Sequence, residues 1–320
     1  MGGVSETSIS SASRYSIDFQ FGCQDSETGL FRTQHVDGIM GMSAAEDTIP
    51  HQLVTQQITK SRIFALCFSI GGGVLTLGGV DQTLHKTGAS IQYAKLLKPK
   101  GWFTVKLLDV SMRASLSSKH LAVMKRTRTN SSKNSTYSIN ADVAALNFRK
   151  GVIVDSGTTD TYLPISVRDL FEKLFRKVTD GITYTNSNIA LSRSQLEKLP
   201  TIIYTLEGEE GSPPVEIESE PSSYMERLGD GKFAFRIYLT ESAGAILGAN
   251  VMNNHNVIFD IDNKRIGFVS SECKYENGRN YGTSLMHVNP DPPIPPDSNM
   301  NSLELFQKSL SSFTSSLLGY

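Results

Sequence analysis

The sequence predicts an all-β fold, built mostly from strands with a few short helices and arranged in two related lobes. Short segments of alternating apolar and polar residues recur along the chain, as in 102–111 and 233–239, and this period of two is typical of half-buried strands. The pattern Gly-Ile-Met-Gly at 38–41 returns about 207 residues later as Ile-Leu-Gly at 246–248, an internal echo that two lobes related by an approximate twofold axis would leave.

The composition is that of an ordinary globular protein and argues against several classes of partner. The 320 residues carry a net charge of −1, with 39% apolar and 20% charged residues, so there is no overall attraction to nucleic acid or to a membrane surface. No apolar run reaches the roughly 18 residues of a spanning helix, and the first residues lack the basic start and apolar core of a targeting signal. The length accommodates two modest domains or one large one.

The first 60 residues predict two strands and one helix. After a Ser-rich start, apolar side chains alternate with polar ones over 15–21, ending in Phe21, which predicts an amphipathic strand. A short apolar segment, 36–42, follows a polar loop and is expected to form a strand. Residues 49–58 then predict a short helix with Leu53 directed inward.

Residues 61–85 predict a β-hairpin. Two apolar segments, 62–70 and 74–79, flank the turn Gly71-Gly72-Gly73, which is typical of a hairpin connection. A Gly-rich turn can also hold a phosphate group, but neither a helix start nor a Lys follows this one. No nucleotide site is therefore predicted.

The next segment combines a strand with a basic stretch. Residues 102–111 alternate as a half-buried strand does, whereas 113–150 lack compact patterning and carry six basic residues before the first acid, Asp142. We expect 113–150 to be a flexible, exposed, basic insertion, with a polyanion site as the alternative. Two acceptor sequons in it, at Asn130 and Asn134, are candidate glycosylation sites if the chain enters the secretory pathway.

The most informative stretch follows at Asp155. Three apolar residues without alternation precede it, which indicates a strand covered on both faces that ends in a carboxylate. Gly157 allows backbone N–H groups to approach that carboxylate, and the hydroxyls of Ser156, Thr158 and Thr159 can donate hydrogen bonds to it. These residues are expected to form a loop that holds Asp155 for chemistry.

The remainder of the chain predicts one longer helix, several strands and a tail. A single helical stripe holds Val167, Leu170, Phe171, Leu174, Phe175 and Val178. Strands are expected in the apolar segments 199–204, 215–218, 233–239 and 265–269, and the segments 245–252 and 257–260 are also largely apolar. The final part, 275–320, predicts a Pro-rich linker and a mobile tail, with a short amphipathic helix at 303–318.

Asp-Ser-Gly-Thr-Thr at 155–159 resembles the second active-site loop of the pepsin-like (A1 family) aspartic endopeptidases. The resemblance extends over residues 16–274 and includes Ile-Leu-Gly at 246–248 and Ile-Gly-Phe at 266–268. It implies a bilobal β-barrel fold in which each lobe contributes one Asp, and the pair activates a water that hydrolyses a peptide bond. It also implies a peptide or protein substrate, no cofactor and no metal.

The first Asp-Thr-Gly loop of that family has no counterpart, since Asp155 begins the single Asp-Thr/Ser-Gly sequence in the chain. We therefore expect a family member truncated at its N-terminus, whose one remaining Asp cannot share a proton with a second and is inactive alone. The expected division is a remainder of the first lobe over 1–60, an inter-lobe hairpin over 61–85, and a complete second lobe over 86–274.

The three cysteines are Cys23, Cys67 and Cys273. In relatives of the beta-secretase type, a Cys in the connecting hairpin pairs with one just after the Ile-Gly-Phe strand, so the resemblance implies a disulfide between Cys67 and Cys273. Cys23 would then be unpaired within this chain, and three reduced buried thiols are the alternative. A zinc site is not expected, because there is no Cys-x-x-Cys spacing and the six His are scattered.

Three functions stay open at this point. The chain is part of an aspartic endopeptidase, or an inactive remnant that binds peptides or regulates another protein, or an active homodimer in which two chains each supply Asp155. A monomer is the expected state. The resemblance implies the secretory pathway, in a vacuole-like or lysosome-like compartment or outside the cell, and no nucleic-acid or nucleotide partner.

Overall fold

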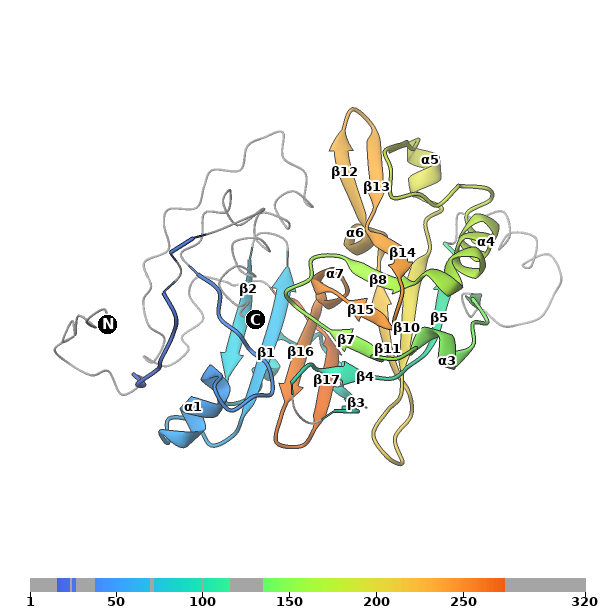
Figure 1. Ribbon diagram of the computed structural model, residues 1–320. Helices are drawn as coiled ribbons and strands as arrows, with labels where there is room; N and C mark the ends of the chain where they lie inside the picture. The colour runs from blue at the N-terminus through green and yellow to red at the C-terminus, as the bar shows by residue number, and fades with distance from the viewer. Residues whose placement is uncertain are drawn as a thin grey trace.

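A computed structural model describes residues 16–23, 25–26, 38–69, 72–98, 101–115 and 135–273 (Figure 1). Three expectations lie outside these residues: the sequons at Asn130 and Asn134, most of the basic insertion, and the tail after 273. No helix in the described part of the chain is long and apolar enough to span a bilayer.

Two five-stranded sheets organise the described residues. The platform sheet is antiparallel and contains, in spatial order, β2 (Gly72–Leu77), β1 (Ile63–Ser69), β16 (His255–Asp260), β17 (Arg265–Ser270) and β3 (Gln92–Lys95). The mixed sheet contains, in order, β14 (Ile237–Glu241), β8 (Thr161–Pro164), β15 (Ala245–Leu247), β7 (Val152–Val154) and β4 (Thr104–Val105).

Two smaller sheets and short helices complete the fold. The four-stranded sheet has the order β11 (Val215–Ser219), β10 (Thr201–Leu206), β5 (Leu107–Arg113) and β6 (Thr136–Ser138). The hairpin sheet has the order β12 (Met225–Gly229), β13 (Lys232–Phe235) and β9 (Ile189–Ala190). The helices are α1 (Ile49–Thr55), α3 (Val143–Leu146), α4 (Arg168–Val178), α5 (Arg193–Leu196), α6 (Pro221–Tyr224) and α7 (Ala249–Met252), with 3-10 turns at Gln82–Leu84 and Ile165–Val167.

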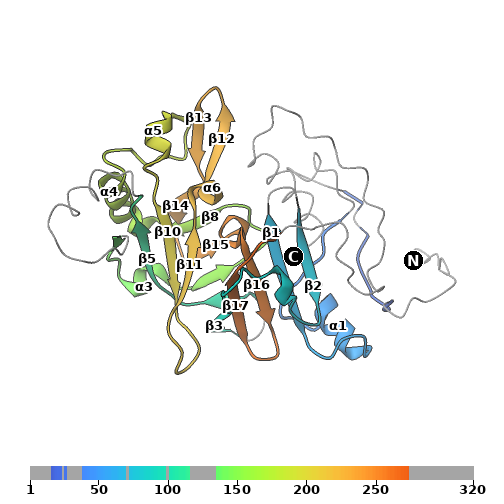
Figure 2. The same ribbon diagram turned by 180° about the vertical axis from the view of Figure 1, so that it is seen from behind.

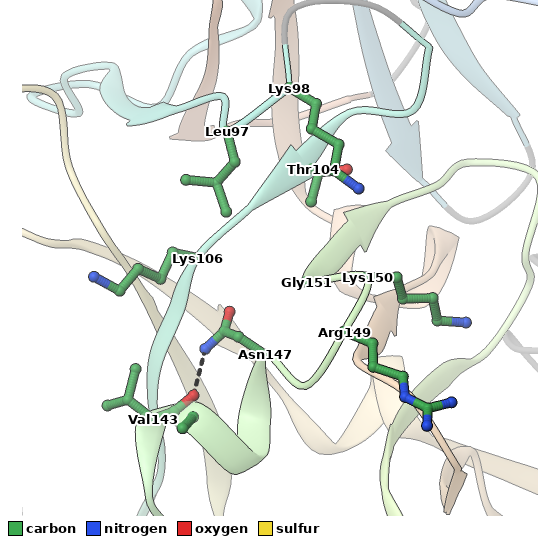
Figure 3. Close-up of a pocket in the computed structure, with 10 residues that line it drawn as sticks. Leu97, Lys98, Thr104, Lys106, Val143, Asn147, Arg149, Lys150 and Gly151 are labelled. Carbon is green, nitrogen blue, oxygen red and sulfur yellow. Dashed lines mark hydrogen bonds between the residues drawn. The ribbon is translucent and has the colours of Figure 1, made fainter.

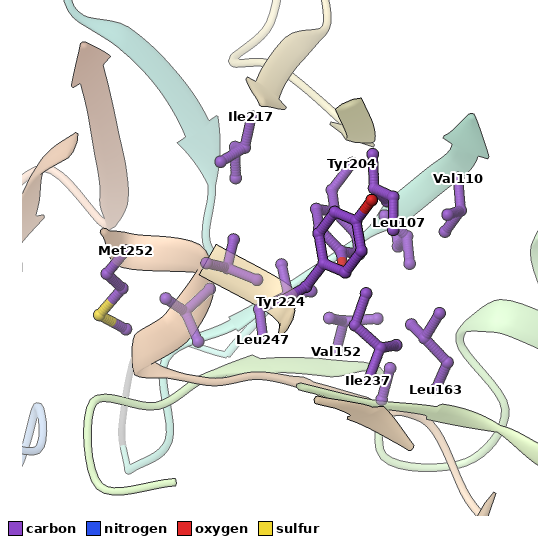
Figure 4. Close-up of a cluster of buried hydrophobic side chains, with 14 of the residues drawn as sticks. Leu107, Val110, Val152, Leu163, Tyr204, Ile217, Tyr224, Ile237, Leu247 and Met252 are labelled. Carbon is purple, nitrogen blue, oxygen red and sulfur yellow. The ribbon is translucent and has the colours of Figure 1, made fainter. Parts of the chain in front are cut away.

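The main core lies between the mixed sheet and the four-stranded sheet (Figure 4). Side chains of β7, β8 and β15, such as Val152 and Leu247, meet those of β5, β10 and β11, such as Leu107 and Tyr204, and all four are essentially inaccessible to solvent. Burying a large apolar side chain contributes roughly 1.5–3 kcal/mol. No sheet of the described residues closes into a barrel, so the expected β-barrel is corrected to open sheets packed face to face.

The platform sheet joins segments that are far apart in the sequence. Strand β1 pairs with β16, with Ile63 opposite Asp260, so the hairpin expected between the lobes shares one sheet with the end of the expected second lobe. Phe64 stacks on Phe259 with ring centroids 4.5 Å apart. A disulfide links Cys67 to Cys273 across 206 residues, the pair that the resemblance implied, and closing so long a loop stabilises a fold by roughly 3–5 kcal/mol.

Local periodicity located several elements correctly. Helix α1, the β1–β2 hairpin and helix α4 lie where the sequence predicts them. On α4, the predicted inward residues Phe171, Leu174, Phe175 and Val178 are buried, but Leu170 is 40% exposed. The apolar stripe is therefore narrower than predicted.

Other sequence predictions were wrong. Residues 16–22 form no strand, and Phe21 is 76% exposed. The backbone N–H and carbonyl of Asp18 bond to the side-chain amide of Gln56. Residues 38–42 form no strand either. Residues 135–150, included in the basic insertion, contain β6 and α3, and Leu146 is fully buried; this end of the segment is packed and not flexible.

Candidate active site

The Asp155 loop, residues 155–160, connects β7 to β8 around a third strand. β15 lies between β7 and β8 in the mixed sheet, pairing in parallel with β7 and antiparallel to β8. The backbone N–H of Asp155 donates to the carbonyl of Leu247 at 3.0 Å. The loop therefore passes over the end of β15, and its first residue is anchored to that strand.

The carboxylate of Asp155 is held at both oxygens by its own loop. The backbone N–H of Gly157 donates to Oδ1 at 2.9 Å, and the hydroxyl of Thr158 donates to Oδ2 at 2.6 Å. Neither Ser156 nor Thr159 donates a hydrogen bond to Asp155, and the side chain of Thr159 faces solvent. The predicted loop forms around Asp155, but only one of the three hydroxyls reaches the carboxylate.

A glycine that follows β15 fixes the shape of the loop. A Cβ atom at Gly248 would lie 2.2 Å from the carbonyl oxygen of Asp160 and 2.5 Å from that of Thr158, distances that no side chain tolerates. The two residues after this glycine, Ala249 and Asn250, donate their N–H groups to the carbonyls of Thr158 and Thr159 at 2.8 and 3.1 Å. The first two residues of α7 therefore hold the backbone of the loop through two hydrogen bonds.

Sequence reasoning missed the residues that hold the far end of the loop. Asn250 accepts a hydrogen bond from the hydroxyl of Thr161 at 2.7 Å and donates to the carbonyl of Arg236 at 3.0 Å. Asp160 lies near the guanidinium of Arg236, and burial raises the pKa of its carboxyl to about 6 although Arg236 opposes the shift. Nothing in the local sequence distinguished these residues, since each acts through partners that are distant in the chain.

A cavity of about 380 Å³ lies elsewhere, beside β4 and α3 (Figure 3). Its centre is apolar, and four basic side chains rim it: Lys98, Lys106, Arg149 and Lys150. Two of them are already paired, Lys106 with Glu207 at 2.7 Å and Lys150 with Glu241 at 3.0 Å. No residue of the Asp155 loop lines this cavity, so it is separate from the candidate active site.

Within the described residues, no three His, Cys, Asp or Glu side chains lie close enough together to hold a metal ion. The site itself presents a fixed carboxylate at the end of a buried strand. Such a carboxylate can accept a proton from water or from a second acid placed against it.

The protein is mostly β, and its candidate site is a carboxylate held in the loop between two strands of one sheet. A sequence profile of the eukaryotic aspartyl protease family matches residues 2–271. Because this match covers most of the chain, the protein belongs to that family.

Individual relatives agree with the family match. The chain is 26% identical to aspartic proteinase 36 of Arabidopsis thaliana over 275 residues, covering 79% of this chain and 49% of that protein. It is 27% identical to a beta-secretase of Strongylocentrotus purpuratus over 285 residues, covering 74% and 47%. It is 26% identical to aspartic protease 5 of Toxoplasma gondii over 262 residues, covering 79% and 23%. The chain therefore spans about half or less of the length of these relatives.

Proposed function

We propose that the protein takes part in the hydrolysis of peptide bonds as an aspartic endopeptidase, with Asp155 as one of its two catalytic carboxylates. The observation that carries the proposal is the way Asp155 is presented. It stands at the end of the buried strand β7, and donors from Gly157 and Thr158 hold both of its oxygens. Membership of the aspartyl protease family supports the assignment.

The mechanism requires a second carboxylate opposite Asp155. Two carboxylates about 3 Å apart cannot both ionise, so such a pair holds one proton between them. The ionised member takes a proton from the attacking water while the protonated member donates one to the peptide carbonyl. The hydrogen bonds to Asp155 fix the plane of its carboxylate, and Gly248 keeps the loop in that position.

No second Asp-Thr/Ser-Gly sequence occurs in the 320 residues, so we propose that the second acid comes from outside them. This observation also favours a second candidate, an inactive protein that binds peptides or regulates a partner. A homodimer in which each chain supplies Asp155 is a further route to a complete pair. For the endopeptidase and for the homodimer, the proposed substrate is a peptide or protein. A monomer is the proposed state of the endopeptidase.

The proposed location is the secretory pathway, in a vacuole-like or lysosome-like compartment or outside the cell. The Cys67–Cys273 disulfide supports it, since disulfides persist in oxidising compartments. If the chain follows this route, Asn130 and Asn134 are the proposed glycosylation sites. Mass spectrometry of protein secreted from a eukaryotic host, before and after removal of N-glycans, tests both residues.

The deciding experiment is cleavage of a peptide library at acid pH, with and without pepstatin, by the 320-residue chain and by a longer form that supplies the second acid. Pepstatin-sensitive cleavage that disappears in Asp155→Asn supports the endopeptidase, and a specific activity that rises with protein concentration identifies the homodimer. Peptide binding without cleavage, unchanged in Asp155→Asn, identifies the inactive protein. Cleavage that persists in Asp155→Asn overturns the proposed role of Asp155.

A further inference from the structure

Arg236 holds the distal arm of the Asp155 loop through its backbone. The distal arm is defined as residues 158–160 together with Thr161, the first residue of β8. It interrupts what the sequence predicted as one strand over 233–239 and lies between β13 and β14. Its carbonyl accepts hydrogen bonds from the N–H of Thr161 at 3.3 Å and from the amide of Asn250 at 3.0 Å. Its own N–H donates to the carbonyl of Tyr224 at 2.7 Å. One residue thus contacts β8, α7 and the end of α6.

The side chain of Arg236 lies among two largely buried carboxylates. Its guanidinium is paired with Glu226 on β12, and it approaches Oδ2 of Asp160 at 3.9 Å. It also donates to the hydroxyl of Tyr238 at 2.9 Å. The side chains of Glu226, Asp160 and Arg236 are 10%, 15% and 23% exposed. Two acids therefore face one base in a region that water screens poorly.

We propose that Arg236 is a positioning residue for Asp155, acting through the distal arm of the loop. Its carbonyl and guanidinium fix Thr161 and Asp160, and the arm in turn fixes Thr158, whose hydroxyl donates to Asp155 at 2.6 Å. The catalytic importance of this support rests on the proposed function, whereas the support itself is a property of the fold. The same contacts connect the Asp155 loop to β12. This strand belongs to the hairpin sheet at the top of Figure 1.

Burial makes the support depend on pH. The side chain of Asp160 is 15% exposed, and burial raises the pKa of its carboxyl to about 6 although the guanidinium of Arg236 opposes the shift. The folded loop therefore favours the protonated acid. The other titratable groups beside the cluster of Glu226, Arg236 and Asp160 are Tyr162 and Tyr238, whose rings stack 5.1 Å apart, and Glu241, which is paired with Lys150. The distal arm is held more firmly in acid than at neutral pH.

Hydrogen–deuterium exchange of the full 320-residue chain tests the proposal without requiring activity. The readout is the protection of peptic fragments that cover 155–164 and 245–254, corrected for the intrinsic pH dependence of exchange. In the wild-type protein, we expect protection to fall about tenfold between pH 5 and pH 7, because opening the loop returns Asp160 to its ordinary pKa. In Asp160→Asn, which cannot ionise, we expect this pH dependence to disappear.

Charge variants test Arg236 itself. Arg236→Met should lower protection of both fragments by about tenfold or more at pH 5, Arg236→Lys should recover part of it, and Arg193→Met should behave as wild type, because Arg193 pairs only with Glu197 on the surface. The double variant Glu226→Gln/Arg236→Met removes both charges and serves if the single change prevents folding. Its fragments should also lose protection, since the guanidinium is absent.

Two outcomes overturn the proposal: a pH dependence in Asp160→Asn equal to that of the wild type, or protection in Arg236→Met and in the double variant equal to that in Arg193→Met. Cleavage assays on the same variants, in a form of the protein that supplies the second acid, address the proposed function separately. There, Asp155→Asn should abolish cleavage whatever its effect on exchange, and Arg236→Met should lower kcat more than it raises KM. An unaffected Asp155→Asn enzyme would refute the role of Asp155 and leave the structural role of Arg236 intact.

Discussion

Residues 38–41 and 246–248 carry nearly the same sequence, yet the structure uses them differently. Residues 245–247 form β15, which has β7 on one side and β8 on the other, and Gly248 then packs against the Asp155 loop. Residues 38–41 form no strand and are at most half buried, and a Cβ atom at Gly38 would meet nothing within 4 Å. Among the described residues, the repeated pattern forms a strand only where partner strands flank it.

The largest difference between the two segments is expected when one methyl group is added to a glycine of each, Gly248 and Gly38. Gly248→Ala places a Cβ atom against two backbone carbonyls, so we expect it to lower the free energy of unfolding by about 4 kcal/mol or more. Gly38→Ala should change it by less than about 0.5 kcal/mol, since the space is open. Urea denaturation followed by circular dichroism measures both. Equal effects would show that the two segments are packed alike.

Truncating Leu247, which precedes Gly248, or Met40, which precedes Gly41, should give a smaller difference in stability between the two segments. Leu247 is 1% exposed at the centre of the main core, and Leu247→Ala should cost roughly 2–4 kcal/mol through lost contacts and the cavity left behind. Met40 is only partly buried, so Met40→Ala should cost about 1 kcal/mol or less. Thermal unfolding of the two variants under one set of conditions decides the matter, and a larger loss for Met40→Ala would contradict it.

The same contrast explains how much of the fold was predictable. Helix α4 and the β1–β2 hairpin were predictable because neighbouring residues specify them, through an apolar stripe in one and a Gly-rich turn in the other. The pairing of β1 with β16 was not, because the paired residues lie about 195 positions apart and no local pattern selects the partner. The alternation over 233–239 likewise hid the break at Arg236, whose carbonyl bonds to β8 and α7 while its N–H bonds to Tyr224 at the end of α6.

The candidate site was predictable to the level of its loop and no further. An apolar run that ends in Asp155 and a Gly two residues later is a local signal. Which hydroxyl reaches the carboxylate depends on the path of the loop around β15, and that path depends on Gly248. The contributions of Asn250 and Arg236 depend on tertiary contacts alone.

Within the Asp155 loop, two neighbouring hydroxyls should differ. Thr158 donates to Asp155 at 2.6 Å, so Thr158→Val should lower the free energy of unfolding by roughly 1.5–3 kcal/mol at neutral pH, the usual range for a hydrogen bond to a charged group. Ser156→Ala removes a hydroxyl that makes no bond to Asp155 and should cost less than about 0.5 kcal/mol. Chemical denaturation compares the two. A larger loss for Ser156→Ala would mean that the loop follows a different path in solution.

The smallest expected effect is a change of stability with pH, which differs between the region of Asp160 and that of His255. Burial raises the pKa of Asp160 to about 6, so its contribution to stability is present in acid and declines as the pH rises from 3.8 to 6. On the platform sheet, burial lowers the pKa of His255, so its contribution is present above 6.5 and declines as the pH falls. The two regions therefore oppose each other, and the total stability of the wild-type protein does not isolate either one.

The difference between wild type and Asp160→Asn removes His255, which is common to both proteins. Between pH 5 and pH 7, the free energy of unfolding of Asp160→Asn should rise by roughly 1–1.5 kcal/mol relative to wild type, because Asn does not ionise in the buried cluster. Guanidinium denaturation at several pH values measures the difference. A constant difference would mean that Asp160 is hydrated in solution, and the acid preference of the loop would then have to come from another group.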